Sequence, residues 1–193
     1  MQKSLDDMTN EELWALFPIV LSESDPMYPD LFRLEASLLR DAIGFRSVAR
    51  LSHIGSTAVP GLLAKPTIDI LLELTGATDL EALDRAMDAA GYRLVPQPEK
   101  PPPHRMYLKG YTPEGFKGQV FHAHVRYFGD WDELYFRDYL RRHPDAAEQY
   151  ARLKSRLAEE YANDRDGYTE AKTEFIAKHT SLARAEIGAI YAP

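Results

Sequence analysis

Residues 52–74, SHIGSTAVPGLLAKPTIDILLEL, decide how the first half of the chain folds. An apolar segment ends at Ile54, the chain turns at Gly55 and Ser56, and an apolar run over 68–74 then carries an acid at Asp69. Strand-favouring residues bounded by glycine and proline predict strands over 45–54 and 68–74. Neither the turn nor the acid suits a packed core, so the stretch indicates a site where two strands end.

Side-chain alternation divides the second of these strands into two unlike faces. Asp69, Leu71 and Glu73 share one face, because successive side chains of a strand point to opposite sides. The other face is wholly aliphatic and is expected to face the core; it comprises Ile68, Ile70, Leu72 and Leu74.

The composition indicates a protein with a substantial core. The chain has 193 residues, of which 45% are hydrophobic, and this length favours either one compact domain or one domain with an extension. We expect an N-terminal helix and turn segment over 1–25 and a single domain over 26–193.

The absence of cysteine excludes disulfides and thiolate metal sites. A net charge of −7 argues against a nucleic-acid polymer as partner. The acidic N-terminus lacks a signal-peptide core, and no apolar run suits a membrane span, so a cytoplasmic location without membrane association is expected.

The remaining pattern predicts an α+β fold. Thr9 and Glu12 have capping-box spacing at the start of one predicted helix, and Thr78 and Glu81 have it at another. Apart from the two strands above, helices are expected over 9–17, 31–43, 78–91, 131–142, 144–161 and 168–187, and strands over 92–95, 105–111 and 119–128. Leu182 is expected to face inward in the last helix. This order predicts a small mixed β-sheet backed by helices, with a C-terminal helical extension from about residue 131.

Common nucleotide-binding motifs are absent from the sequence. It contains neither G-x-G-x-x-G nor G-x-x-x-x-G-K-[ST]. The turn itself offers another phosphate site, because the backbone N–H groups after Gly55 and the hydroxyls of Ser56 and Thr57 can form a concave set of donors. The alternative is a β-turn in which the serine and threonine only cap the local backbone.

Three further side chains could bind a cation beside that turn. Asp69 stands near the start of a buried strand, where a carboxylate can hold a cation that also binds phosphate. Its alternative is a structural role, such as a pair with Lys65. His122 and His124, in FHAHVRYF, lie on one strand face about 6–7 Å apart and can share a metal or grip an anion. The alternative is that both are inert, while His53 is expected to pack against the turn.

Arginines in FRDYLRRHP are candidates for binding phosphate. Arg137 and Arg141 are four residues apart, so they lie on one face of the predicted helix. Guanidinium groups bind phosphate bidentately. The alternative is pairing with nearby acids. Lys65 and Arg105 are weaker phosphate candidates.

These motifs together resemble the GrpB family. The resemblance rests on HIGSTAVPGLLAKPTIDILLEL, the later FHAHV, the stretch FRDYLRRHPDAAEQYARLKSRLAEEY and the following YTEAKTEFI, and it covers nearly the whole chain from Tyr28. GrpB proteins are grouped with the nucleotidyltransferase superfamily, and in some bacteria a GrpB domain is fused to dephospho-coenzyme A kinase. The resemblance implies a nucleotidyltransferase-like fold.

The resemblance also implies roles for particular residues. In the superfamily a Gly-Ser turn holds nucleotide phosphates, an Asp-x-Asp pair on the next strand holds two divalent cations, and a third acid comes from a later strand. Gly55 and Ser56 match the turn, and Asp69 matches the first acid. Leu71 stands at the second acid position, and histidines stand where the third acid is expected.

This departure bears on the metal and on the chemistry. Leucine cannot bind a cation, and two-metal phosphoryl transfer needs carboxylates on both sides of the phosphorus. Mg²⁺ or Mn²⁺ is expected if oxygen ligands dominate, and Zn²⁺ if His122 and His124 bind the ion. The expected metal ligands and catalytic residues are Asp69, His122 and His124.

Two functions use these residues, and a third possibility, a scaffold that dimerises through its helical block, needs neither His122 nor Asp69. The first is a nucleotidyltransferase-like enzyme, a transferase acting on a nucleoside triphosphate and a small-molecule or protein acceptor. In it Gly55, Ser56, Thr57, Lys65, Arg137 and Arg141 bind the substrate. The second is a non-catalytic module that binds a nucleotide or another phosphorylated metabolite at a degenerate metal site. The amphipathic C-terminal helices could pack on the sheet or on a second copy, so a homodimer is a candidate assembly.

Overall fold

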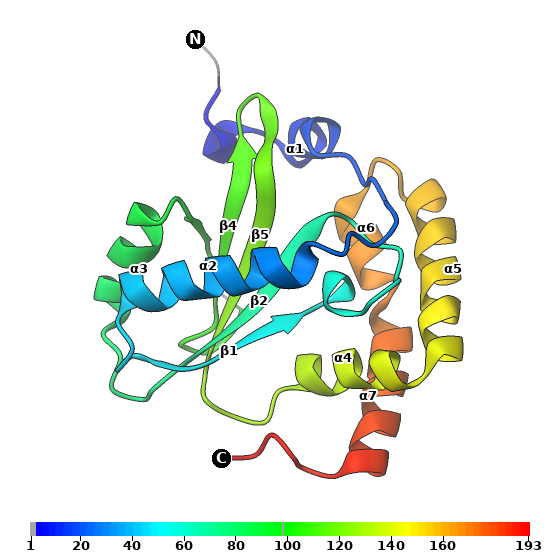
Figure 1. Cartoon of the computed structure of the whole chain (residues 1–193). Helices are drawn as coiled ribbons and strands as arrows, with labels where there is room; N and C mark the ends of the chain where they lie inside the picture. Colours follow the sequence, from blue (N-terminus) through cyan, green and yellow to red (C-terminus); the bar gives the residue numbers. More distant parts are fainter. Residues whose placement is uncertain (1–2, 98) are drawn as a thin grey trace.

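Five strands form one mixed sheet in the computed structural model, which describes residues 3–97 and 99–193 (Figure 1). They are β1 (Val48–Ile54), β2 (Thr67–Leu74), β3 (Arg93–Val95), β4 (Arg105–Thr112) and β5 (Gly115–Tyr127). Their order is β1-β2-β5-β4-β3, with β2 parallel to β5 and the other pairs antiparallel. The predicted α+β class is confirmed.

Helices pack against the sheet. They are α1 (Asn10–Leu16), α2 (Tyr28–Ile43), α3 (Leu80–Ala89), α4 (Asp132–Arg142), α5 (Pro144–Glu160), α6 (Arg165–Glu170) and α7 (Thr173–Ile187), with short 3-10 turns η1 (Leu5–Asp7) and η2 (Ser56–Ala58). Figure 1 shows α4 to α7 gathered at the opposite end of the molecule from α3. None of the helices in the described part of the chain combines the length and the apolar character that a membrane crossing requires.

The main core lies between α2, α3 and one face of the sheet. Ile68, Ile70, Leu72 and Leu74 of β2 are all fully buried in it. This is the aliphatic face that the alternation of β2 predicts. Burying each such side chain contributes about 1.5–3 kcal/mol, so this face fixes the register of β2 and thereby the direction of its other side chains.

The second face of β2 turns toward the C-terminal helices. Leu71 packs there with Ile54 of β1 and Leu134 of α4. A separate apolar cluster joins the loop after η2 to α4 and α5, and it includes Val59, Leu62 and Leu140. The helical extension is therefore fastened to the loop between the first two strands, directly over the face that carries Asp69.

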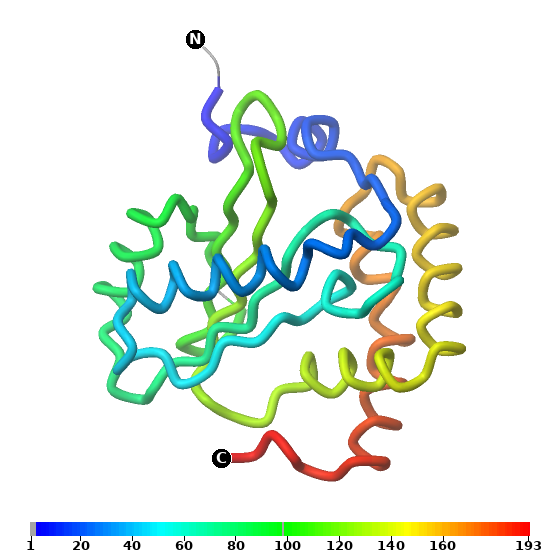
Figure 2. Tube along the Cα trace, viewed as in Figure 1, coloured from blue at the N-terminus to red at the C-terminus, as the bar shows by residue number. Residues whose placement is uncertain are grey.

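The N-terminal segment lies at the tip of the β4–β5 hairpin, as the chain trace in Figure 2 shows. Phe17 contacts Tyr111 of β4 and Phe116 of β5, with ring centroids 4.8 and 5.0 Å apart. Ser22 forms a backbone bridge with Ala64, which links the segment to the loop before β2. The division of the chain at residue 25 stays a prediction.

Several predicted details are wrong at the ends of elements. Thr78 does not cap α3; Asp79 does, by accepting from the Glu81 and Ala82 N–H groups, while the Thr78 hydroxyl donates to the carbonyl of Ser47. The predicted last helix is two helices, because Asp164 caps a separate α6. Leu182 is 43% exposed and does not face inward. The predicted Thr9–Glu12 capping box is confirmed.

Candidate metal and anion site

The parallel register of β2 and β5 brings three candidate ligands together. Asp69 of β2 lies opposite His122 of β5, and His124 follows on the same face of β5. Oδ1 of Asp69 is 3.2 Å from Nδ1 of His122 and 3.3 Å from Nε2 of His124. One ligand atom from each of the three residues lies within 4.8 Å of the other two. The predicted convergence is therefore present.

Tyr111 orients the first histidine. Its hydroxyl is 2.8 Å from Nε2 of His122, which leaves Nδ1 of that ring facing Asp69. The phenol ring also stacks on the imidazole, with centroids 5.8 Å apart. A hydrogen bond to the far nitrogen of a ligand histidine fixes its tautomer and ring direction. Sequence reasoning missed Tyr111, which lies on the neighbouring strand β4.

The protonation states suit metal binding. Burial of the Asp69 carboxyl opposes its ionisation, but hydrogen bonds from His122 and His124 outweigh this and hold its pKa well below the usual range. Burial lowers the pKa of His122 and favours the neutral imidazole. A carboxylate and neutral imidazoles are the forms that bind metal.

The donor set fits a divalent transition metal. Two imidazole nitrogens and one carboxylate oxygen suit Zn²⁺, Mn²⁺ or Fe²⁺ better than Mg²⁺, which prefers oxygen ligands. Three protein ligands leave further coordination positions open, as in catalytic metal sites. Asp69, His122 and His124 would hold the ion, and the open positions would be available to a substrate oxygen.

Gly55 allows the turn to pack directly on Asp69. Its φ of +71° lies in the region that favours glycine. A Cβ at this position would lie 3.0 Å from Cγ of Asp69 and closer still to Oδ2. The turn and the acid in residues 52–74 are therefore parts of one site. Glycine is required at position 55 both because φ is positive and because a Cβ would clash with Asp69.

Four cationic side chains line the same pocket as the candidate ligands. The pocket has a volume of about 360 Å³ and is also lined by Gly55 and Ser56. Its cations are Lys65, Arg165 of α6, Lys154 of α5 and Lys172, which immediately precedes α7. In the described ranges, none of the four has a carboxylate within ion-pair distance.

Burial and neighbouring cations perturb the three lysines of this cluster, Lys65, Lys154 and Lys172. Burial, aided by repulsion from neighbouring cations, lowers the pKa of Lys154 and of Lys172 to about 7. Burial and the nearby Arg165 lower the pKa of Lys65 to about 8. Unpaired cations brought together at this cost indicate a site for an anion, because a bound anion would relieve the repulsion.

Hydrogen bonds and aromatic rings hold the lysines in place. Nζ of Lys154 donates to Oγ of Ser56 at 3.0 Å and to the carbonyl of Leu63. Its ammonium also lies 4.7 Å from the ring centroid of Tyr150. The ring of Tyr168 lies 3.9 Å from Nζ of Lys172. Cation–π contacts of this kind position an ammonium without neutralising it.

A second compartment opens beside the candidate metal ligands. It has a volume of about 700 Å³ and shares Gly55, Ser56, Asp69, His124, Tyr150 and Lys172 with the cationic pocket. Its own walls include Trp131, and Arg126 lies 5.7 Å above that ring. The candidate ligands thus stand where a cationic pocket meets a larger pocket with an aromatic wall.

The structure divides the predicted substrate-binding residues between two places. Gly55, Ser56 and Lys65 line the same pocket as the candidate metal ligands. Arg137 and Arg141 line a different pocket, and their guanidinium groups bond to the carbonyls of His53 and Ala58. This places two of the expected phosphate ligands away from the candidate metal ligands.

Two other predicted candidates are held by neighbouring protein groups. The Thr57 hydroxyl is buried and donates to the Thr67 carbonyl at 2.9 Å. Arg105 pairs with Asp84 of α3. Sequence reasoning missed two cations that do line the pocket.

Lys154 and Lys172 come from the helical extension, whose packing on the sheet the sequence does not specify. The sequence does place Lys154 four residues after Tyr150, on one helix face, and this spacing could have predicted that the two side chains lie together.

Other acids of the β2 face do not join the site. Leu71 is fully buried against Ile54 and Leu134, so the position of the second expected acid is part of the core. Glu73 is also fully buried, pairs with Arg50 and accepts from the Gly129 N–H group. Asp69 is thus the acid that β2 contributes to this cleft.

Fold and site together define an α+β protein with three candidate metal ligands beside a cationic pocket. The GrpB protein family model matches residues 18–182, so the chain belongs to the GrpB family. UPF0157 protein PA4798 of Pseudomonas aeruginosa is 41% identical over 164 residues, which are 84% of this chain and 66% of that protein. The glutamate-rich protein GrpB of Alkalihalophilus pseudofirmus is 35% identical over 82% of this chain and 91% of its own length.

Two further comparisons extend this result. The crystal structure of the conserved protein GrpB from Enterococcus faecalis superposes with a TM-score of 0.75 at 29% identity, over 86% of this chain and 98% of that one. A dephospho-CoA kinase of Mycolicibacterium paratuberculosis is 29% identical over 82% of this chain and 44% of its own length.

Proposed function

We propose that the cleft binds a nucleoside triphosphate together with one divalent cation and transfers its nucleotidyl group to a hydroxyl of a small molecule or protein. The acceptor oxygen would form the new bond to the α-phosphorus, and pyrophosphate would be the leaving group. The observation that carries this proposal is the shared pocket of Asp69, His122 and His124 with four cationic side chains. Metal ligands and unpaired cations around one pocket suit a substrate that is highly charged and rich in oxygen.

Each part of the cleft has a distinct task in this proposal. A cation held by Asp69, His122 and His124 would neutralise phosphate oxygens as a Lewis acid. Lys154 and Lys172 would supply the positive charge that a second cation provides in two-metal enzymes. The buried Leu71 offers no ligand for a second cation here. The N–H groups after Gly55 would bind phosphate oxygens.

The larger compartment suits the remainder of the substrate. Trp131 offers a flat apolar surface for a base, and the volume of about 700 Å³ lies in the ordinary range for ligand pockets. Transfer to a polynucleotide is disfavoured by the net charge of −7.

The first test measures metal and nucleotide binding separately. Metal content after exposure to Mn²⁺ or Zn²⁺ is compared for the natural chain, His124→Asn and His143→Asn; His143 directly follows α4 and pairs with Glu186. Calorimetry with ATP, GTP, CTP and UTP then compares Lys172→Met with Lys178→Met. We expect His124→Asn to lose the metal and Lys172→Met to lose nucleotide affinity, with both controls unchanged. Equal effects of either variant and its control would refute the proposed site.

A second candidate function is nucleotide or metabolite binding without transfer. Leu71 favours it, because a fully buried leucine replaces an acid that two-metal transfer requires. Release of pyrophosphate and transfer of label from an α-labelled triphosphate separate the two functions. Binding with neither product supports the binding module, whereas either product at a rate that His124→Asn abolishes supports the transferase.

A further inference from the structure

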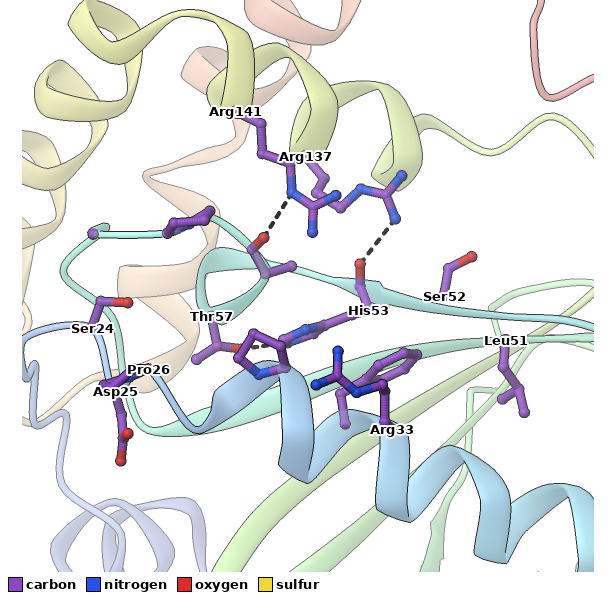
Figure 3. A pocket seen from close by; sticks show the side chains of 15 residues that line it. Ser24, Asp25, Pro26, Arg33, Leu51, Ser52, His53, Thr57, Arg137 and Arg141 are labelled. Atoms are coloured by element: carbon purple, nitrogen blue, oxygen red, sulfur yellow. Dashed lines mark hydrogen bonds between the residues drawn. The ribbon is translucent and has the colours of Figure 1, made fainter.

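A second pocket lies at the same turn but away from the metal ligands. It has a volume of about 720 Å³ and is bounded by residues before and within α2, by β1, by η2 and by α4 (Figure 3). Thr57 and Ala58 line it, whereas the preceding Gly55 and Ser56 line the metal cleft. Neither the three metal ligands nor the lysine cluster lines this pocket.

The pocket has apolar walls and one side that carries two arginines. Its apolar part includes Phe32 and Leu51 and three prolines, Pro26, Pro29 and Pro60. Figure 3 shows the guanidinium groups of Arg137 and Arg141 close together on α4, across the pocket from Asp25 and Arg33. Such a combination of apolar walls and a few charged groups is typical of small-molecule sites.

Arg137 is a fixed part of this wall. It donates to Asp138 at 2.7 Å, to the carbonyl of His53 at 3.0 Å and to the hydroxyl of Tyr191 at 3.0 Å. All of its donor nitrogens are thus engaged by protein groups. Arg137 therefore contributes charge and shape to the pocket.

Arg141 has terminal N–H donors that could bind a ligand. Its Nε donates to the carbonyl of Ala58 at 2.8 Å, which aims the guanidinium. Its Nη1 lies 3.7 Å from Asp138, a carboxylate already bonded by Arg137 and by Tyr191. Within residues 3–97 and 99–193, the terminal nitrogens of Arg141 have no hydrogen bond. Burial and the neighbouring Arg137 lower the pKa of Arg141, which is the effect of a cation without a full counter-charge.

His53 gives the pocket a neutral aromatic floor. Its Nε2 is 3.0 Å from Oγ1 of Thr57, whose own hydroxyl donates to the Thr67 carbonyl, so Nε2 carries the proton. Burial lowers the pKa of His53 to about 4 and keeps the ring uncharged. The ring stacks on Phe32 with centroids 4.9 Å apart, which makes a flat apolar surface.

We propose that this pocket binds a small organic anion, with a carboxylate or phosphate head on Arg141 and an apolar body against His53 and Phe32. A guanidinium with free terminal nitrogens binds either head group bidentately. The apolar body is required by the walls, since a bare inorganic anion would leave most of the pocket without contacts. This site is independent of the nucleotide site, because none of its contacts involves Asp69 or the lysine cluster.

The test uses 3-phenylpropionate and phenyl phosphate as probes, with neutral 3-phenylpropanol as the uncharged analogue. Binding is followed by protein-detected NMR and by calorimetry for the natural chain, Arg141→Met and Arg142→Met. Arg142 is the matched control, because both arginines belong to α4 and both side chains are 40% exposed, while Arg142 pairs with Glu186. Lys172→Met separates this pocket from the metal cleft.

We expect saturable binding of at least one anionic probe, with shifts at His53 and Phe32. The dissociation constant should rise at least tenfold in Arg141→Met, rise less in Arg141→Lys, and stay unchanged in Arg142→Met and Lys172→Met. The stronger of the two probes identifies the head group. Absence of saturable binding by both anions, equal binding of the alcohol, or equal effects of the two arginine variants would overturn the proposal.

Discussion

Binding of a polyphosphate to the lysine cluster should be coupled to proton uptake. In the free protein Lys154 and Lys172 have a pKa of about 7 and Lys65 has a pKa of about 8. At pH 8 the first two are therefore about 90% neutral, and the third is about half protonated. A bound polyphosphate favours the charged form of all three, so binding at pH 8 should take up about two protons.

The sign of the pH dependence follows from the same values. Because binding takes up about two protons near pH 8, the association constant should fall about 100-fold per pH unit there. Near pH 6 the lysines are already about 90% protonated or more, so uptake by the protein should be close to zero.

The same pKa values predict how stability depends on pH. Because the lysine pKa values are lower in the folded protein, the unfolded chain binds more protons than the folded protein between pH 7 and 10.5. The free energy of unfolding of the unliganded protein therefore rises with pH across that window.

Calorimetry in buffers of different ionisation enthalpy measures this uptake. Inorganic tripolyphosphate is titrated at pH 8 in the presence of a chelator, so that metal binding does not contribute. The slope of the observed enthalpy against the buffer's ionisation enthalpy gives the number of protons. Lys172→Met should reduce that number by about one, and Lys178→Met, an exposed position of α7, should not change it. Binding at pH 8 without proton uptake, or equal slopes for the two variants, would refute the reasoning.

Three further substitutions probe the turn, the core and the orientation of the metal ligand. Gly55→Ala should cost about 2 kcal/mol or more in unfolding free energy and weaken metal binding; Gly61→Ala, with a φ of +75° and open space around it, isolates the cost of φ. Leu71→Asn should cost about 2–5 kcal/mol in urea unfolding, whereas Leu182→Asn, 43% exposed, should cost well under that. Tyr111→Phe should weaken Zn²⁺ binding about 10–100-fold without unfolding the chain; unchanged affinity by metal-competition titration would show that the hydroxyl has no orienting role.

Much of the sheet follows from local pattern. The alternation around Asp69 predicts the aliphatic face that packs in the main core, but it does not predict that Leu71 and Glu73 on the other face are fully buried as well. The capping box at Thr9 is equally local and is found as predicted. Thr78 shows the limit of such patterns, because its hydroxyl bonds to Ser47 of a distant segment and leaves the cap to the next residue.

The candidate site was predictable only in part. Asp69, His122 and His124 could be proposed from strand periodicity, but their meeting depends on β2 and β5 being parallel neighbours, which no local pattern specifies. Arg137 and Lys172 show the other limit. Both are cations on the helical extension, and only the packing of that extension decides which of them lines the metal cleft.

The parallel pairing of β2 with β5 also bears on how the protein folds. Asp69 and His124 are 55 residues apart in the chain, and the β4–β5 hairpin can form without β2. A partly folded chain that lacks the β2–β5 pair therefore has no cluster of three ligands. Metal binding stabilises only the state that contains the cluster. A bound ion would therefore lower the free energy of the completed sheet relative to every intermediate in which β2 and β5 are not yet paired.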